Sequence, residues 1–498
     1  MCGICGQLRF DGDTPSSESL DNMMNKLARR GPDSNGKWLE GKIGFGHQRL
    51  SIIDLSSYGS QPMIDSLLKL TLVFNGTIYN YKQLRSRLIG KGYSFFSSSD
   101  TEVIIKAYHY WGEDCVNHLD GMFAFAIWDK PSKKLFIARD RMGIKPLYYN
   151  LTNKAFTFAS NSQALLTQDL DKSVNPIALQ QQLSLHGVVP APNTIINGIK
   201  KLKPGTYIVL SEKGDIKEQT YWHPSATRPE GNVSEQDYIA RTHELLTAAV
   251  TKRMAASDVP IGVLLSGGLD SSLVVALLKE AGHRDIRTFS IGFEDIDDES
   301  GSEFEYSDQV VSKFKTDHKK YLLSNQEVLP RLSEAVMNMS EPMVGQDAIA
   351  FYLLSEQVSK HTKVVLSGQG ADEAFAGYFW YPRMAKEHGD EIESFSKHYV
   401  DRPHEEYLQT VMPIYQGENH THKWLSKEFL KPGADSFIDK VFRTDMTRLI
   451  VDDPVKRVDN MTMAWGLEAR VPFMDTELVE WALKIPPSLK MRGQGKYP

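Results

Sequence analysis

A buried apolar run that passes directly into a turn rich in glycine and serine is the feature that most constrains this fold. The stretch LLSGGLDSSLVVALLKE, residues 264–280, indicates the end of a strand, a turn and the start of a helix. In such a turn several backbone N–H groups converge with the positive end of the helix dipole, so we expect an anion there. The turn is not a GxxxxGK[ST] phosphate loop, because the lysine is absent and Asp270 lies within it. The alternative is an ordinary glycine-rich turn between a strand and a helix.

A second loop, VVLSGQGADEAFAGY at residues 364–378, also follows a fully apolar strand. Loops at the carboxyl ends of parallel strands face one crevice, where α/β folds bind ligands. Asp372 and Glu373 are therefore candidates for a carboxylate that binds Mg²⁺, a cation that prefers oxygen ligands. For each acid alone, the alternative is a solvated turn with a helix-capping side chain.

The chain divides into two styles of sequence. Residues 1–214 contain short β-rich runs such as KIGFGHQRLSII and GMFAFAIWD, and they predict stacked antiparallel sheets with a few helices. Residues 215–236 include a segment rich in Pro, Gly, Ser and Asn and predict a linker. Residues 237–498 alternate longer helical patterns with apolar strands, which indicates a parallel α/β sheet.

Composition narrows the classes of function. The 498-residue chain has 57 Lys and Arg against 63 Asp and Glu, a balance that does not favour a nucleic-acid partner. Its 3 cysteines are too few for a disulfide scaffold and suit a reducing compartment. The sequence shows no secretory leader and no unbroken apolar stretch of membrane-spanning length, so we expect a cytoplasmic protein with no membrane partner.

Motifs along nearly the whole chain, taken in order, resemble those of glutamine-dependent asparagine synthetases. They are MCGICG, LARRGPDSNG, GHQRLSIIDLS, FNGTIYNY, SSSDTEVI, ARDRMGIKPLYY, LLSGGLDSS, SGQGADEAFAGY and VDNMTMAWGLEARVPFMD. The resemblance implies an α+β N-terminal-nucleophile sandwich of αββα layers with antiparallel sheets, followed by an α/β parallel-sheet ATP-pyrophosphatase domain. It also implies ATP and Mg²⁺ as cofactors, glutamine and a small carboxylate acceptor as substrates, and ammonia transfer through an internal tunnel. It leaves a homodimer open.

By this resemblance Cys2 is the nucleophile of a glutaminase, and its position supplies a physical reason. After removal of the initiator methionine, Cys2 carries a thiol and a free α-amino group, whose ordinary pKa of about 7.7–8.0 lets it accept the thiol proton. The resemblance assigns the oxyanion donors to the Asn75 side chain and the Gly76 N–H. Arg49 and Asp100 would bind the carboxylate and amino group of glutamine. For Cys2 considered alone, the alternative is an inert terminal thiol.

The other two cysteines have a simpler interpretation. Cys5 and Cys115 are expected to be small buried hydrophobic side chains. They have no part in the implied chemistry.

The resemblance also assigns the nucleotide site. The implied ATP-binding residues are Leu265, Ser266, Gly267, Gly268, Asp270, Ser271, Ser272, Ile291, Ser367 and Gly368. Among them, Leu265, Ile291 and the Ser367–Gly368 pair match positions that contact adenosine, and the remainder hold the pyrophosphate portion. Asp270 and Asp372 would place Mg²⁺.

Three positions depart from the family pattern. Thr77 stands where most members have a glutamate that helps to bind the amino group of glutamine, and Asp100 could carry that contact with help from the Thr77 hydroxyl or a backbone carbonyl. Gln369 replaces an acid on the acceptor side of the second site. Asn460 replaces a Lys or Arg that helps to neutralise phosphate charge, and Lys456 or Arg457 could compensate.

The departures are concentrated on the acceptor side and suggest a branch of the family. SGQGADE, SEPMVGQDAIAFYLLSEQVSKH, LHGVVPAPNTI and FWYP are most similar to N-acetylglutaminylglutamine amidotransferases, which amidate an acetylated dipeptide to make a compatible solute. A pocket with fewer charges suits a dipeptide whose amino end is blocked, because an unpaired buried charge is costly. The alternative acceptor is aspartate, as in an asparagine synthetase.

Other classes of function remain open at this point. A glutaminase-like regulatory protein with a decayed synthetase half conflicts with the intact SGGLDSS and with Asp270 and Asp372, and a β-lactam-forming synthetase would not need Cys2. The chain ends in GQGKYP, where relatives continue, so we expect a C-terminal truncation. The acidic run at residues 294–308 predicts a solvated loop, which could alternatively close over ATP.

Overall fold

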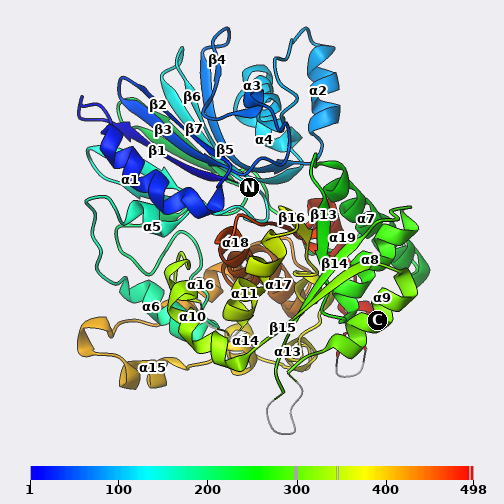
Figure 1. The fold of residues 1–498 in the computed structure, drawn as a ribbon. Helices are drawn as coiled ribbons and strands as arrows, with labels where there is room; N and C mark the ends of the chain where they lie inside the picture. The colour runs from blue at the N-terminus through cyan, green and yellow to red at the C-terminus, as the bar shows by residue number, and fades with distance from the viewer. Residues whose placement is uncertain (1, 296–300, 344, 346, 493–494, 497–498) are drawn as a thin grey trace.

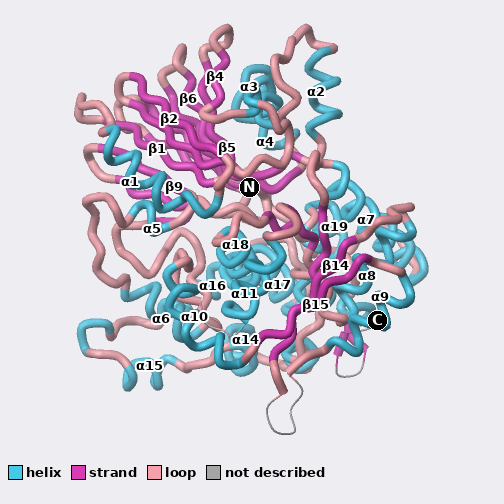
Figure 2. The backbone as a smooth tube through the Cα atoms, in the orientation of Figure 1, coloured by secondary structure: helices cyan, strands magenta, loops and turns pink. Residues whose placement is uncertain are grey.

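A computed structural model describes residues 2–295, 301–343, 345, 347–492 and 495–496 of the chain. It consists of an N-terminal domain built around two sheets and a C-terminal domain in which helices surround one sheet (Figure 1). The strands of the two domains form separate groups, and helices occupy most of the second domain (Figure 2).

The N-terminal domain contains two six-stranded antiparallel sheets. The first has the order β10-β8-β9-β1-β3-β2, and the second has the order β12-β11-β7-β6-β5-β4. The strands are β1 Gly3–Arg9, β2 Ser34–Glu40, β3 Ile43–Arg49, β4 Met63–Asp65, β5 Leu70–Ile78, β6 Gly121–Asp129, β7 Lys134–Arg139, β8 Tyr148–Leu151, β9 Ala155–Ala159, β10 Lys200–Lys201, β11 Thr206–Ser211 and β12 Ile216–Thr220.

Alternation of side chains along the strands produces four layers. In β1, Ile4 and Leu8 pack in the core between the sheets, whereas Cys5 packs on the opposite face, under the first helix. Helices α1 (Ser17–Leu27) and α5 (Ser162–Leu165) cover the first sheet, and α3 (Asp100–Trp111), with α2 (Tyr81–Ile89) beside it, covers the second. The predicted αββα sandwich is therefore confirmed. The domain also contains α4 (Cys115–His118) and α6 (Pro176–Ser184).

The C-terminal domain has one five-stranded parallel sheet of order β15-β14-β13-β16-β17. Its strands are β13 Ile261–Leu264, β14 Arg287–Phe293, β15 Asp317–Leu323, β16 Val364–Leu366 and β17 Glu468–Arg470. Helices α7 (Glu235–Ala255) and α8 (Leu269–Glu280) pack on one face, and α11 (Asp347–Ser359) and α18 (Lys456–Met463) pack on the other. The predicted parallel α/β domain is confirmed.

The described part of the C-terminal domain contains further α-helices. They are α9 Phe304–Phe314, α10 Asn325–Met337, α12 Ala371–Phe375, α13 Trp380–Met384, α14 Glu391–Tyr399, α15 His404–Thr410, α16 His420–Phe429, α17 Phe437–Thr444, α19 Thr476–Ala482 and α20 Pro487–Lys490. Two π-helical turns, Asp445–Leu449 and Val451–Val455, join α17 to α18, and the second contains Pro454. A short hairpin of β18 (Met491–Arg492) and β19 (Gly495–Lys496) completes the described chain.

Two predicted irregular segments contain regular structure. Part of the predicted linker 215–236 forms β12, which pairs with β11, and α7 begins at Glu235. The expectation of a loop throughout residues 294–308 is wrong where α9 begins at Phe304, while residues 296–300 lie outside the described part of the chain. Helix α9 forms because Val310, Val311 and Phe314 pack against the core despite the acidic composition of the preceding run.

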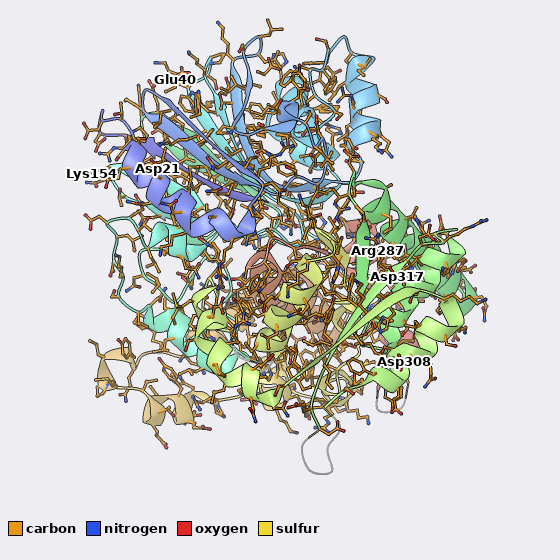
Figure 3. The ribbon with its side chains drawn as sticks, viewed as in Figure 1. Asp21, Glu40, Lys154, Arg287, Asp308 and Asp317 are labelled. Atoms are coloured by element: carbon orange, nitrogen blue, oxygen red, sulfur yellow. The ribbon has the colours of Figure 1, made fainter. Side chains whose placement is uncertain are left out.

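Charged side chains lie on the outer surface of both domains. Asp21 on α1, Glu40 at the end of β2 and Asp308 on α9 are examples (Figure 3). Within the described ranges, no helix combines the length and apolar character needed to cross a membrane. Cys5 and Cys115 are fully buried, as expected.

Candidate active sites

Cys2 lies at the start of β1, in a narrow cavity of the N-terminal domain that we call the first cavity. Its backbone nitrogen donates to Asn75 Oδ1 at 3.0 Å, and its carbonyl oxygen accepts from Arg30 Nε at 3.3 Å. The next residue, Gly3, must be small, because a Cβ there would lie 2.6 Å from Leu27 Cβ of α1. Burial raises the pKa of the Cys2 thiol. The residue therefore needs a nearby base to lose its proton at neutral pH.

The two predicted oxyanion donors lie beside Cys2 on β5. Asn75 is buried, and its Nδ2 makes no hydrogen bond to any residue that the structure describes. Gly76 has φ +155°, and a Cβ there would lie 2.1 Å from the Met122 carbonyl oxygen of β6. Only glycine is tolerated at position 76, where β5 packs closely against β6. The Asn75 Nδ2 group is available to donate to an anionic oxygen.

Two charged residues predicted to bind glutamine also line the first cavity. Arg49, at the end of β3, donates from its guanidinium to the carbonyls of Asp54 and Ser56, the latter at 3.0 Å. Asp100, the first residue of α3, accepts the Ile78 N–H on Oδ2 at 3.0 Å. Burial, together with the nearby Glu468 carboxylate, raises the pKa of Asp100 to about 6.

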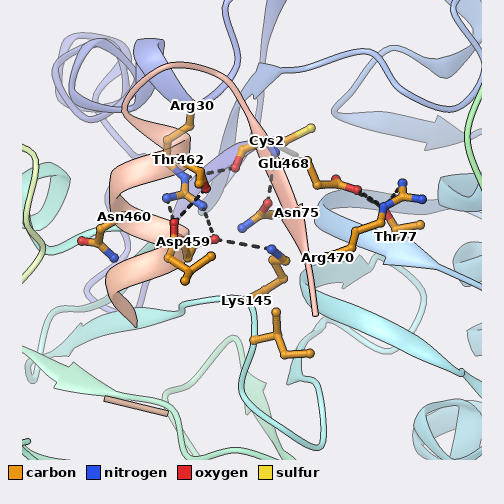
Figure 4. A network of polar contacts seen from close by, with 12 residues as sticks. Cys2, Arg30, Asn75, Thr77, Lys145, Asp459, Asn460, Thr462, Glu468 and Arg470 are labelled. Atoms are coloured by element: carbon orange, nitrogen blue, oxygen red, sulfur yellow. Dashed lines mark hydrogen bonds and ion pairs between the residues drawn. The ribbon is translucent and has the colours of Figure 1, made fainter. Parts of the chain in front are cut away.

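Glu468 is a charged lining residue of the first cavity that the sequence did not reveal. It comes from β17 of the C-terminal domain, yet it shares the first cavity with Cys2 and Asp100. Thr77 Oγ1 lies 3.2 Å from Glu468 Oε1, and Arg470 Nε donates to the same oxygen at 2.6 Å (Figure 4). No local pattern around Glu468 signals this position, because only the packing of the two domains creates it.

The C-terminal domain contains a larger cavity of about 1150 Å³, the second cavity, at the carboxyl ends of its strands. Among the residues predicted to bind ATP, acceptor or metal, those that line it are Leu265, Ser266, Gly268, Asp270, Ser271, Ile291, Ser367, Gly368, Gln369 and Asp372. The two predicted loops are in close contact, since a Cβ on Gly368 would lie 3.0 Å from the Ser271 nitrogen. The structure therefore brings both loops into one site.

Two predicted nucleotide-binding residues are not among the lining residues. Gly267 has φ +92°, and a Cβ there would lie 2.5 Å from the Ser307 nitrogen of α9, so its role is to permit that close packing. The Ser272 hydroxyl donates to the Gly268 carbonyl at 2.7 Å. Both belong to the turn and support its shape.

Asp270 and Asp372 fit the requirements of a Mg²⁺ site only in combination with a ligand. They line the same cavity from the two loops, but the described residues contain no cluster of three or more His, Cys, Asp or Glu able to hold a metal. Mg²⁺ in proteins is commonly held by one or two carboxylates together with phosphate oxygens and water. The pair fits a metal that arrives with a nucleotide.

A third cavity, of about 590 Å³, adjoins the second, because Asp347, Glu373 and Tyr378 line both. Its walls are aromatic and acidic, and the described residues that line it alone are His186, Gly345, Trp380, Tyr399, Asp445, Leu449, Ile450, Asp453, Pro454 and Arg457. Burial raises the pKa of both Glu373 and Asp445. The two π-helical turns supply part of the wall, and such turns are frequent at functional sites.

Asn460 and the two basic residues predicted to compensate for it, Lys456 and Arg457, lie on α18. Asn460 is buried, accepts the Ser340 N–H at 2.6 Å and donates to the Lys456 carbonyl at 2.8 Å, so it does not face the second cavity. Arg457 lines the third cavity and forms ion pairs with Asp347 at 3.3 Å and Asp453 at 3.4 Å. Of the two proposed basic residues, Arg457 is thus the one that lines the third cavity.

A small internal cavity lies at the interface of the two domains. It is lined by Arg139, Gly143, Ile144, Pro146, Leu147, Tyr148 and Lys201 of the first domain and Val451, Asp452, Val455, Lys456, Asp459 and Asn460 of the second. Asp459 binds Arg30, which contacts the Cys2 carbonyl (Figure 4), and Asp452 precedes Asp453 of the third cavity. The lining of the internal cavity is therefore linked through Asp459 and Arg30 to the neighbourhood of Cys2, and Asp452 links it along the chain to the wall of the third cavity.

Comparison with known proteins finds a family model for each of the two domains. A glutamine amidotransferase domain model matches residues 1–222, and an asparagine synthase model matches residues 241–498. Asparagine synthetase [glutamine-hydrolyzing] 1 of Bacillus subtilis is 33% identical, with 100% of this chain and 83% of that protein covered. Putative asparagine synthetase [glutamine-hydrolyzing] 2 of Methanocaldococcus jannaschii is 35% identical over 76% of each chain. A solved glutamine phosphoribosylpyrophosphate amidotransferase of B. subtilis aligns with TM-score 0.35 and 14% identity, covering 66% of this chain and 92% of its own.

Proposed function

The chain belongs to the asparagine synthetase family of ATP-dependent, glutamine-hydrolysing ligases, and from this premise we propose that its acceptor is N-acetylglutaminylglutamine. The first cavity hydrolyses glutamine, and the second and third cavities activate and amidate the acceptor. The product is the dipeptide amide, a compatible solute.

In the proposed first reaction the Cys2 sulfur attacks the side-chain amide carbon of glutamine. The thiol proton passes to the α-amino group of the same residue, a role supported by the absence of histidine from the described lining of the first cavity. Asn75 Nδ2 and the Gly76 N–H stabilise the oxyanion. The C–N bond then breaks, and the departing nitrogen takes the proton from the α-amino group and leaves as ammonia. Water then hydrolyses the thioester to glutamate and restores the thiol.

In the proposed second reaction a carboxylate oxygen of the acceptor attacks the α-phosphorus of ATP. The bond to the β-phosphate breaks, which releases pyrophosphate and leaves an acyl adenylate. The Ser266–Ser272 turn, with its N–H groups at the start of α8, supports binding of the pyrophosphate portion. Mg²⁺, held by Asp270 and Asp372 together with the phosphates, would neutralise their charge. Ammonia then attacks the acyl carbon, loses a proton, and displaces AMP.

We propose that ammonia crosses between the sites through the internal cavity. Free ammonia is mostly protonated in neutral water, so confinement preserves it as a nucleophile. The lining of that cavity supports this route, because Asp459 reaches the Cys2 carbonyl through Arg30 and Asp452 directly precedes Asp453 of the third cavity.

One observation carries the acceptor assignment, namely the third cavity beside the nucleotide site. Its volume of about 590 Å³ lies in the range of about 300–1,000 Å³ typical of small-molecule sites and is much larger than free aspartate requires. The neighbouring Gln369 is uncharged, and the raised pKa values of Glu373 and Asp445 favour neutral carboxyl groups. Such walls suit the amide groups of a blocked dipeptide.

Aspartate is the second candidate acceptor. Asp347 and Asp453, the two acids that pair with Arg457, could instead bind the ammonium group of aspartate. In addition, the two relatives described above carry asparagine synthetase names. This reading requires that the third cavity close around a much smaller ligand.

The deciding experiment is ATP-dependent pyrophosphate release by the purified protein with glutamine and either acceptor, with product masses measured. The assignment is supported if pyrophosphate is released with the dipeptide and the product has the mass of the dipeptide with its carboxyl hydroxyl replaced by an amide nitrogen. Release with aspartate alone would replace it with asparagine synthesis.

A further inference from the structure

The first cavity contains one acidic side chain from the other domain. Glu468 is fully buried on β17 and lines this cavity together with Arg49 and Asp100. Its position is set by the parallel sheet, where Glu468 pairs with Val364 and Arg470 pairs with Leu366 of β16. The proposed glutaminase site is therefore built from both domains.

The charges of the cavity can be matched to those of a free α-amino acid. Such a ligand presents a carboxylate, for which Arg49 supplies a guanidinium, and an ammonium group with three N–H donors. Asp100 has a pKa of about 6 and so loses part of its charge in weakly acidic solution. Although burial opposes ionisation of Glu468, the Arg470 guanidinium and other nearby positive charges lower its pKa to about 2. The lasting negative charge in the cavity is thus that of Glu468.

Glu468 is also held rigidly enough to act as a receptor. Arg470 Nε donates to its Oε1 at 2.6 Å, and the Arg470 guanidinium is itself fixed by the carbonyls of Arg253 and Ala256. On the cavity side, Thr77 Oγ1 lies 3.2 Å from Oε1 and 3.4 Å from Oε2. Threonine carries no charge, so the carboxylate of Glu468, and not Thr77 of β5, supplies the negative charge at this wall.

We propose that Glu468 receives the α-ammonium group of glutamine together with Asp100, so that the synthetase domain completes the glutamine-binding site. The inference rests on the proposed hydrolysis of glutamine in the first cavity. It assigns Glu468 a role in selecting substrates that carry an α-ammonium group. A purely structural role would affect every substrate of Cys2 equally.

The test compares L-glutamine with 4-carbamoylbutanoate, which has the same amide and carboxylate but lacks the α-amino group. Ammonia release is measured for the full chain and for Glu468→Gln, and selectivity is the ratio of the two kcat/KM values. Loss of one charge-assisted hydrogen bond should reduce the selectivity of the variant for glutamine by about 10–100-fold. The kcat/KM for the analogue should change much less.

Two further variants make the result decisive. Glu468→Asp keeps a negative charge beside Arg470 but withdraws it by one methylene, so it should fold and lose selectivity by about tenfold. Glu428→Gln, which removes a carboxylate paired with Arg448 at 3.4 Å away from the described cavities, should leave the selectivity unchanged. Equal loss for both substrates in Glu468→Gln, or unchanged selectivity in Glu468→Asp, would overturn the inference. Failure of the unmodified chain to release ammonia from glutamine would instead refute the proposed function.

Discussion

Arg30 Nη1 lies 2.9 Å from Asp459 Oδ2, and this buried ion pair joins the residue that contacts the Cys2 carbonyl to helix α18 of the other domain. Lys145 Nζ approaches the second oxygen of Asp459 at 3.4 Å. Although burial opposes its charge, the two basic groups hold the pKa of Asp459 below its ordinary value. The pair therefore couples the position of Cys2 to the packing of the domains.

Asp459→Asn should destabilise the protein strongly, because it leaves Arg30 and Lys145 buried without a counter-charge. Breaking a buried pair in this way typically costs about 3–5 kcal/mol. Unfolding in denaturant would measure the change. Glu40→Gln is the matched control, since Glu40 pairs with Lys130 on the surface at 2.5 Å and its loss should cost no more than about 1 kcal/mol. Equal losses in the two variants would contradict the argument.

The raised pKa of Asp100 predicts that glutamine binding weakens in mild acid. The carboxylate is charged above its pKa of about 6 and becomes neutral as the pH falls through that value. Below it, KM for glutamine should rise by up to about tenfold per pH unit. Steady-state ammonia release between pH 5 and 8 would check this, and Glu468→Gln should move the rise to lower pH because a neighbouring negative charge is removed.

The same shift has an opposite consequence for stability. The folded protein holds the Asp100 proton more tightly than the unfolded chain, so the stabilisation by this group is lost as the pH rises through about 6. At pH 7 the ionised group therefore opposes folding, and Asp100→Asn should stabilise the protein by up to about 3 kcal/mol. Thermal unfolding would measure the gain, and a lower melting temperature at pH 7 would contradict it.

Local sequence carries most of the fold and the motif residues of both sites. The alternation of side chains along β1 places Ile4 and Cys5 on opposite faces, and the turn at 266–272 is held by its own glycines and serine hydroxyls. Glu468 could not be predicted, because 391 positions separate it from Thr77 and domain packing alone brings them together. Helix α9 was missed since its acidic start concealed the spacing of Val311 and Phe314.

Asn75 provides a test of the proposed oxyanion site. Its Nδ2 has no hydrogen-bond partner within the described structure, so Asn75→Ala removes a donor that the resting protein does not use, together with the Oδ1 that accepts the Cys2 N–H at 3.0 Å. Loss of one such donor typically lowers kcat by about 10²–10³-fold with little change in KM. Kinetics with glutamine would measure this, and synthesis with added ammonium should persist. A rise in KM alone would indicate a binding role instead.

Gln369 tests which acceptor the third cavity prefers. It lines the second cavity, as does Glu373, which is one of the residues that line both the second and the third cavity. Gln369→Glu adds a carboxylate to the cavity that Glu373 also lines, where burial has already raised the pKa of the Glu373 carboxyl, so an uncharged amide ligand would face an unpaired charge. Dipeptide amidation should fall by about 10–100-fold in kcat/KM, whereas an ammonium-bearing acceptor should gain relative to it. Glutamine hydrolysis in the first cavity, measured as ammonia release without acceptor, is the control. If aspartate use fell while dipeptide use was unchanged, the neutral side chain would not select the acceptor, and asparagine synthesis would become the better account of this site.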